Sequence, residues 1–194
     1  LSKKGAAGAT HVILDIPVGP TAKVRTSQAA DSLRDHLEAV GRAVGLQVRT
    51  LQTDGSQPVG RRIGPALEAW DVLAILQGDA EAPADLRERG LRLAGELLEL
   101  AGGAKAGEGR EKARAVLADG RAWRKFKAIC EAQGGMREPP RAPHTHPVLA
   151  TRSGRVASID NRRLARVAKL AGAPNDRAAG LVLNAKNGDS VTQG

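Results

Sequence analysis

The stretch Val12-Ile13-Leu14-Asp15-Ile16-Pro17-Val18 decides the fold class of this 194-residue chain. It is short and almost continuously apolar, which is typical of a strand buried on both faces of a sheet. Residues 27–44 follow with apolar side chains at helical spacing, and residues 46–51 form a second apolar run. A strand, a helix and a strand in this order predict a βαβ unit with parallel strands.

Helical patterns continue after this unit. Pro65 stands at the first turn of a helix, and further helices are expected over residues 86–101, 110–118 and 121–133. The segment 136–147 is rich in Pro, Arg and His and has no periodicity, so we expect a connecting loop there. The sequence therefore predicts an α/β domain over residues 1–147, with helices flanking a central sheet. A partial α+β unit is expected over residues 148–194.

The C-terminal segment has its own pattern. Residues 148–159 indicate extended chain, and Asp160 is placed to cap a short helix. Residues 180–183 and 186–194 read as two strands around an Asn-Gly turn, which predicts a β-hairpin. The Gly-Asp-x-Val-x-x-Gly pattern at the end is similar to a turn of biotinyl and lipoyl carrier modules. No lysine stands at the expected hairpin tip, which favours a structural β-unit.

Composition limits the class of protein. The chain has a formal charge of +9 and 41% apolar residues, but only 2% aromatic residues. Basic side chains without aromatic platforms for stacking favour a solvated basic surface, so we expect no nucleic-acid partner. The single cysteine Cys130 excludes an intrachain disulfide, and neither a membrane-spanning run nor a signal peptide is visible. These features indicate a cytoplasmic protein with no membrane partner.

Two polar features lie near the first apolar strand, where α/β proteins often bind ligands. The turn Gly19-Pro20-Thr21-Ala22-Lys23 has the layout of a phosphate cradle, although it is not a Walker motif. A plain turn with a solvated lysine is the alternative. Asp15 lies within the apolar strand and needs a partner there, which is compatible with a structural or a functional role.

Other candidate chemistry is weaker. Ser56 has no nucleophile-elbow context, so we expect no serine hydrolase. His144 and His146 form a His-x-His pair without further ligands at suitable spacing, which argues against zinc binding. Asp71 is the odd carboxylate on an apolar helix face. It is either a surface residue or a ligand of a monovalent cation, together with carbonyl groups of the preceding loop.

Three segments together resemble the thymidine and pyrimidine-nucleoside phosphorylase family: Ser2-Lys3-Lys4, residues 15–23 and residues 57–68. The resemblance covers the whole chain. It implies phosphorolysis of a pyrimidine (deoxy)nucleoside such as thymidine by inorganic phosphate, giving free base and (deoxy)ribose 1-phosphate. In this family a helical domain binds phosphate and an α/β domain binds the nucleoside. The resemblance places the helical domain before Leu1, so we expect a fragment that is inactive alone, from a protein that is a homodimer at full length.

The resemblance also implies roles for particular residues. Lys3 matches the lysine that contacts the pyrimidine, and Lys23 matches a lysine that contacts the nucleotide in the AMP phosphorylase branch. A monovalent-cation site, for potassium, would use the carbonyl groups of Val59 and Arg62 and the carboxylate of Asp71, where the family usually has Glu. No catalytic residue and no organic cofactor is expected within this chain.

Two alternatives stay open at the level of the sequence. Lys23 is compatible with a nucleoside monophosphate as substrate, as in the AMP phosphorylases. It is equally compatible with a plain nucleoside if the lysine is only a surface residue. The alternative from another class is a non-catalytic module that binds nucleotides or nucleic acid, which the net charge suggests.

Overall fold

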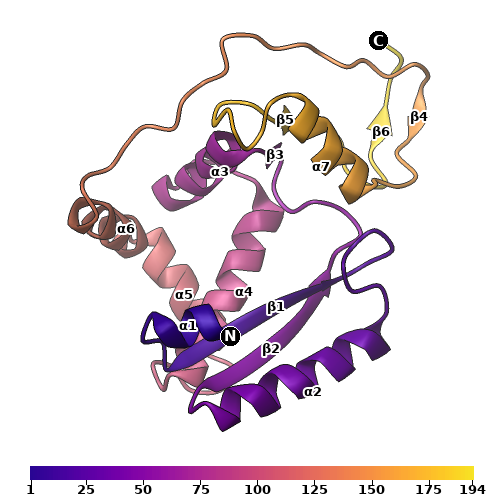
Figure 1. Ribbon diagram of the computed structural model, residues 1–194. Coiled ribbons are helices and arrows are strands. Elements are labelled where there is room, and N and C mark those ends of the chain that lie inside the picture. Colours follow the sequence, from indigo (N-terminus) through magenta and orange to yellow (C-terminus); the bar gives the residue numbers. More distant parts are fainter. The chain divides into compact units, whose positions relative to one another are not determined.

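The computed structural model describes residues 1–194 and contains seven helices and six strands (Figure 1). The strands form three two-stranded sheets, β1–β2, β3–β5 and β4–β6. The chain divides into two compact units: Leu1–Gly55 with Leu86–Asp119, and Ser56–Asp85 with Gly120–Gly194. The mixed α/β class agrees with the sequence, but three small sheets stand where one central sheet was expected. The predicted domain boundary at residue 147 stays a prediction.

The first unit is built on a βαβ arrangement. Strands β1 (His11–Val18) and β2 (Gln47–Asp54) are parallel, and their register runs from His11 opposite Gln47 to Val18 opposite Asp54. Helix α2 (Ser27–Ala43) connects them, which confirms the predicted unit. Val12 and Ile16 are the buried residues of β1, while most of its other residues are half-buried. The strand is therefore correctly predicted, but its burial is less complete than its apolar sequence indicates.

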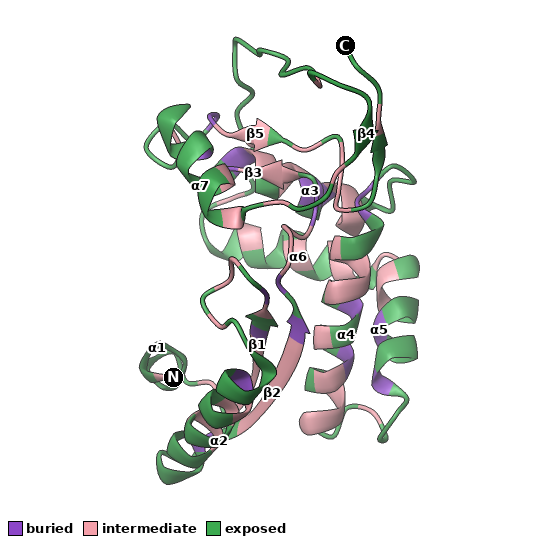
Figure 2. Ribbon diagram, turned by 90° about the vertical axis from the view of Figure 1, so that its right-hand side faces the viewer, coloured by how far each residue is buried: buried purple, intermediate pink, exposed green.

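Helices α2 and α4 (Ala84–Leu100) contact opposite faces of this sheet (Figure 2). On the α2 side, the carboxylate of Glu38 accepts hydrogen bonds from the amide and hydroxyl groups of Thr50 at 3.1 and 3.0 Å. On the α4 side, Arg49 donates to Glu96 at 2.8 Å. Because successive side chains of a strand point to opposite faces, adjacent residues of β2 reach different helices.

Only part of the apolar pattern that predicts α2 is removed from solvent: Ala30 is buried and Leu37 is half-buried. Leu33, Val40 and Val44 are exposed. The buried residues of this helix are Ala30 and Gly41, which are small enough to let the helix approach the strands closely. The helical period thus predicts the helix correctly, whereas polar hydrogen bonds and small residues attach it to the sheet.

Helix α4 contacts α5 (Gly109–Ala118) through two glycines. A Cβ atom on Gly95 would lie 2.6 Å from the backbone nitrogen of Arg110, and one on Gly109 would lie 2.2 Å from the carbonyl oxygen of Gly95. Neither position has room for a side chain. Nearby, Glu99 accepts a hydrogen bond at 2.9 Å from the amide of Gly109, at the start of α5.

The second unit contains a close crossing of two distant segments. Strand β3 (Arg62–Ile63) pairs antiparallel with β5 (Leu181–Val182), and helix α3 (Pro65–Gln77) follows β3. A Cβ atom on Gly180 would lie 2.0 Å from the carbonyl oxygen of Ile63. The preceding Gly64 has a φ of 135° and is similarly crowded by Ala179. Glycine is therefore required on both sides of the crossing.

The predicted C-terminal hairpin is wrong. Strand β6 (Ser190–Val191) pairs with β4 (Gly154–Arg155), and β5 pairs with β3, so the two expected hairpin strands belong to different sheets. The turn at Asn187-Gly188 does form, with the amide of Asp189 donating to the carbonyl of Lys186 at 3.1 Å. The local turn signal was thus correct, but the strand partners come from distant parts of the chain.

The remaining elements follow the sequence closely. Helix α6 (Arg121–Ala132) precedes an irregular segment, as expected, and Arg141 of that segment lies 4.4 Å from the ring centroid of Trp70 in α3. Helix α7 (Asn161–Leu170) is capped by Asp160, which accepts hydrogen bonds from two backbone amides of the first turn. None of the helices has the length and apolar composition needed to cross a membrane.

The glycine contact between α4 and α5 gives a stability prediction. Gly95→Ala should lower the free energy of unfolding by about 1–3 kcal/mol, because a methyl group would overlap the backbone of α5. The matched control is Gly90→Ala in the same helix, where nothing lies within 4 Å of the new Cβ atom. That change should raise stability by about 0.5–1 kcal/mol through helix propensity. Urea unfolding of both variants tests this, and equal effects would contradict the contact.

Candidate functional site

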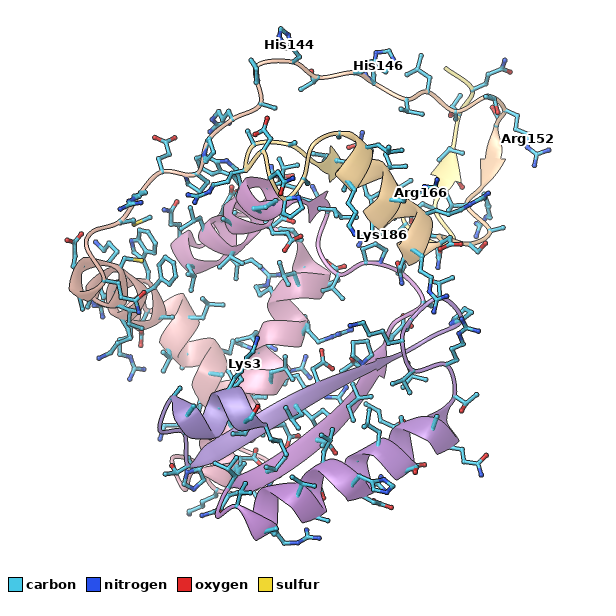
Figure 3. The ribbon with its side chains drawn as sticks, in the orientation of Figure 1. Lys3, His144, His146, Arg152, Arg166 and Lys186 are labelled. Atoms are coloured by element: carbon cyan, nitrogen blue, oxygen red, sulfur yellow. The ribbon has the colours of Figure 1, made fainter.

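The two lysines expected to bind substrate lie in the first unit, and both are exposed. Lys3 belongs to the short helix α1 (Ser2–Ala6), which leads into the start of β1 (Figure 3). Lys23 follows the end of β1, in the segment that leads to α2. Lys3 therefore precedes the eight-residue strand β1 and Lys23 follows it, and no hydrogen bond joins the two side chains.

The turn that resembles a phosphate cradle is closed on itself. The amide of Gly19 donates to the carbonyl of Val24 at 3.1 Å, and the amide of Ala22 donates to the carbonyl of Gly19 at 3.1 Å. Helix α2 starts only at Ser27, where Thr26 caps it by accepting from the amide of Ala29. Two of the backbone amides that a phosphate cradle would use are therefore already bonded within the turn.

Asp15 belongs to a hydrogen-bonded network at the ends of the two parallel strands. Its carboxylate accepts from the hydroxyl of Thr53 at 2.5 Å and from the guanidinium of Arg89 at 2.9 Å. Arg89 also donates to the carbonyl of Asp54 at 2.9 Å. The side chains of Asp15 and Arg89 are 24% and 17% exposed, so the carboxylate has a fixed, partly buried counter-charge. This network supports a structural role for Asp15.

Asp71 is the most deeply buried charged residue, with 1% of its surface exposed. One carboxylate oxygen accepts from the backbone amides of Arg61 and Arg62, at 3.0 and 3.1 Å. The other accepts from the Arg62 guanidinium at 2.6 Å. Asp71 therefore holds the chain between Gly60 and β3 against helix α3. It is not a surface carboxylate.

A second cationic side chain holds the preceding part of the same loop. The ammonium group of Lys186 donates to the carbonyl oxygens of Pro58 and Gly60 and, at 3.1 Å, to the carboxylate of Asp85. The amide of the next residue, Asn187, donates to the side-chain oxygen of Gln57 at 2.7 Å. The segment between β5 and β6 is thus tied to residues 57–60.

These contacts bear on the expected monovalent-cation site at Val59, Arg62 and Asp71. A metal ion bound to Asp71 would stand close to the Arg62 guanidinium. Two unit charges about 4 Å apart repel by about 4 kcal/mol at an effective dielectric constant near 20. The carbonyl groups on either side of Val59 also already face Lys186. As arranged, these residues do not fit a bound metal cation.

Sequence reasoning missed Lys186 and Asp85, and no local signal could have found them. Lys186 is 128 residues from Pro58 and 101 from Asp85, so only the folded chain brings them together. The paired histidines, by contrast, lie where the sequence suggested. His144 and His146 are exposed on the connecting segment after α6, and no group of three metal-ligating side chains includes them (Figure 3).

Several curated proteins match this chain over all 194 residues. It is 63% identical to "Putative thymidine phosphorylase 1" of Acidovorax sp. (strain JS42) and 62% identical to "Putative thymidine phosphorylase" of Polaromonas sp. (strain JS666 / ATCC BAA-500). The identity to the protein of that name from Legionella pneumophila (strain Corby) is 57%. The chain spans 38% of the length of each of these relatives. No family model matches it.

Identity of this level over the whole chain is far above what chance produces. The chain belongs to the family of these proteins, and the predicted relationship to thymidine phosphorylases is confirmed. These relatives are named for thymidine phosphorylase.

The contacts of Asp71 predict a large effect on stability. Asp71→Ala should lower the free energy of unfolding by about 3–5 kcal/mol, because it leaves a guanidinium and two backbone amides without their acceptor. The control is Glu138→Ala, an exposed carboxylate on the connecting segment, which should change stability by less than about 0.5 kcal/mol. Urea unfolding compares the two variants. A loss below about 1 kcal/mol for Asp71→Ala would mean that the carboxylate does not hold the loop.

Proposed function

We propose that the protein acts as a pentosyltransferase in which inorganic phosphate cleaves a pyrimidine (deoxy)nucleoside, such as thymidine. The products are the free base and (deoxy)ribose 1-phosphate. The observation that carries the proposal is the 57–63% identity over the whole chain to proteins named for thymidine phosphorylase. No organic cofactor is required, since phosphate is the co-substrate. The relatives' full length, of which this chain spans 38%, is the form expected to be active, as a homodimer in the cytoplasm.

The chemistry gives Lys3 a role. Phosphate attacks the anomeric carbon while the bond from that carbon to the base breaks, so positive charge develops on the sugar and negative charge on the departing base. A fixed cation near the base carbonyl stabilises the negative charge where it develops. Lys3 is exposed at the start of α1 and makes no side-chain hydrogen bond within the chain that would compete with this role. It is proposed as the group that contacts the base.

Lys23 supports a finer version of the same proposal, with a nucleoside 5′-monophosphate as substrate. A 5′-phosphate needs a cationic partner, whereas a 5′-hydroxyl does not. Backbone hydrogen bonds close the turn that contains Lys23. They hold the backbone of the lysine in place, although its side chain is exposed. This arrangement suits a side chain that reaches toward a phosphate.

The charge distribution suggests an alternative class of protein, a non-catalytic module that binds nucleic acid. Residues 120–194 contain 14 Lys and Arg but only 5 Asp and Glu, so this segment alone accounts for the net charge of +9. Binding that falls steeply with salt is the signature of contacts to a phosphate backbone. Filter binding to DNA across a salt series distinguishes the classes. Strong, salt-dependent binding without any phosphorolysis by the full-length protein would overturn the enzymatic proposal.

The two lysines should have separable effects in the full-length protein. Lys23→Ala should lower kcat/KM on nucleoside monophosphates by about tenfold or more, because charge-assisted hydrogen bonds to phosphate contribute about 1.5–3 kcal/mol each. Activity on thymidine should change much less. Lys3→Ala should lower both activities equally, because its proposed partner is the base. If Lys23→Ala leaves the ratio of the two activities unchanged, the lysine is a surface residue. The proposal of an unphosphorylated nucleoside as substrate then remains.

The 194-residue chain on its own should not turn over substrate. The reason is that, by the family resemblance, the phosphate-binding residues are proposed to lie outside these 194 residues. The release of free thymine from thymidine and phosphate measures this, with the full-length Acidovorax relative as the positive control. A turnover rate for the 194-residue chain equal to that of the relative would contradict the proposed division of the site.

A further inference from the structure

Lys186 stands at the centre of a cluster of oxygen atoms in the second unit. Its ammonium group has three N–H donors, and three acceptors surround it: the carbonyl oxygens of Pro58 and Gly60 and a carboxylate oxygen of Asp85. The donors and acceptors are therefore balanced. The same carboxylate oxygen accepts from the amide of Gly60 at 3.2 Å, so one acidic group and one lysine together hold both sides of Gly60.

The cluster requires a positive charge. Two main-chain carbonyl groups and a carboxylate that point toward one place form the kind of oxygen set that binds cations. The Lys186 side chain is only 22% exposed, so water replaces it poorly as a partner for these oxygens. The side-chain oxygen Oδ1 of the next residue, Asn187, is buried and accepts no hydrogen bond within the chain. Without a cation, the carbonyl oxygens of half-buried Pro58 and buried Gly60 would lose their shared donor, which is costly in a partly buried site.

The other end of the loop already has a cation of its own. The guanidinium of Arg62 donates a hydrogen bond to one carboxylate oxygen of Asp71. The other oxygen accepts hydrogen bonds from the amides of Arg61 and Arg62. Two side-chain cations thus hold the chain from Pro58 to Arg62, one at each end. As described above, a metal cation at Asp71 would be repelled by the guanidinium that occupies it.

We propose that Lys186 is a built-in cation that positions the loop of residues 57–62 and makes this loop independent of a bound potassium ion. The lysine comes from a segment more than 120 residues away, so it also joins the C-terminal part of the second unit to the loop. It acts through the loop and is a positioning residue. The inference concerns the loop and its ion dependence, and it stands whether or not the proposed phosphorolysis is correct.

The test replaces Lys186 with methionine in the whole 194-residue chain, which keeps a long apolar side chain and removes the charge. The control is Lys125→Met, an exposed lysine of α6 in the same unit. Hydrogen exchange is followed at the amides of Gly60, Arg61 and Arg62, which donate to Asp85 and Asp71. Each protein is measured in potassium, ammonium and choline chloride at equal ionic strength, with the midpoint of thermal unfolding as a second readout.

The original chain should show the same exchange and the same unfolding midpoint in all three salts. Lys186→Met should exchange these amides about tenfold faster or more in choline, because charge-assisted hydrogen bonds are lost. Potassium or ammonium should restore part of the protection by entering the oxygen cluster. Lys125→Met should behave as the original chain does.

Three results would overturn the proposal. Saturable, potassium-specific protection of the loop in the original chain would show that a bound ion positions the loop. Unchanged exchange in Lys186→Met would show that the lysine does not position the loop. Lost protection that neither ion restores would assign the effect to packing of the lysine stem. Should Lys186→Met fail to fold, the salt comparison on the original chain still tests whether the loop is independent of potassium.

Discussion

A carboxylate that is removed from water needs partners for both of its oxygens, and Asp71 meets this requirement in a way that orders the second unit. Because the partners are the amides of Arg61 and Arg62 and one guanidinium, burying the charge also fixes the backbone that enters β3. That strand then pairs with β5, and the glycines at the crossing allow the contact. The loop, the sheet and the start of α3 therefore depend on one side chain.

The first unit uses polar contacts in a related way. With only two strands, its sheet cannot bury both faces deeply, and only Val12 and Ile16 of β1 are buried. Hydrogen bonds from adjacent residues of β2 attach a helix to each face, and Arg89 joins α4 to the strand ends through Asp15. Directional contacts fix the register of the helices where apolar area is limited.

The sequence predicted those features whose cause is local. The apolar run of residues 12–18, the first-turn proline at Pro65 and the cap at Asp160 each determine an element by themselves, and each is confirmed. The pairing of β5 with β3 and the contacts of Lys186 depend on residues more than 100 positions apart, which periodicity does not encode. Asp71 was recognised as the odd carboxylate on an apolar helix face, with a surface residue or a cation ligand as the two interpretations. Its partner, Arg62, was expected to contribute only a carbonyl group.

The interleaving of the two units has a consequence for the order of events during synthesis. All residues of the first unit have been made once Asp119 leaves the ribosome, whereas the second unit needs β5 and Lys186, close to the end of the chain. Contacts between residues distant in sequence form late because they must first close a long loop. The nascent chain therefore carries an ordered first unit while the segment from Ser56 to Asp85 still lacks its partners. Until β5 has been made, strand β3 would present an unpaired edge to a chaperone or to another nascent chain.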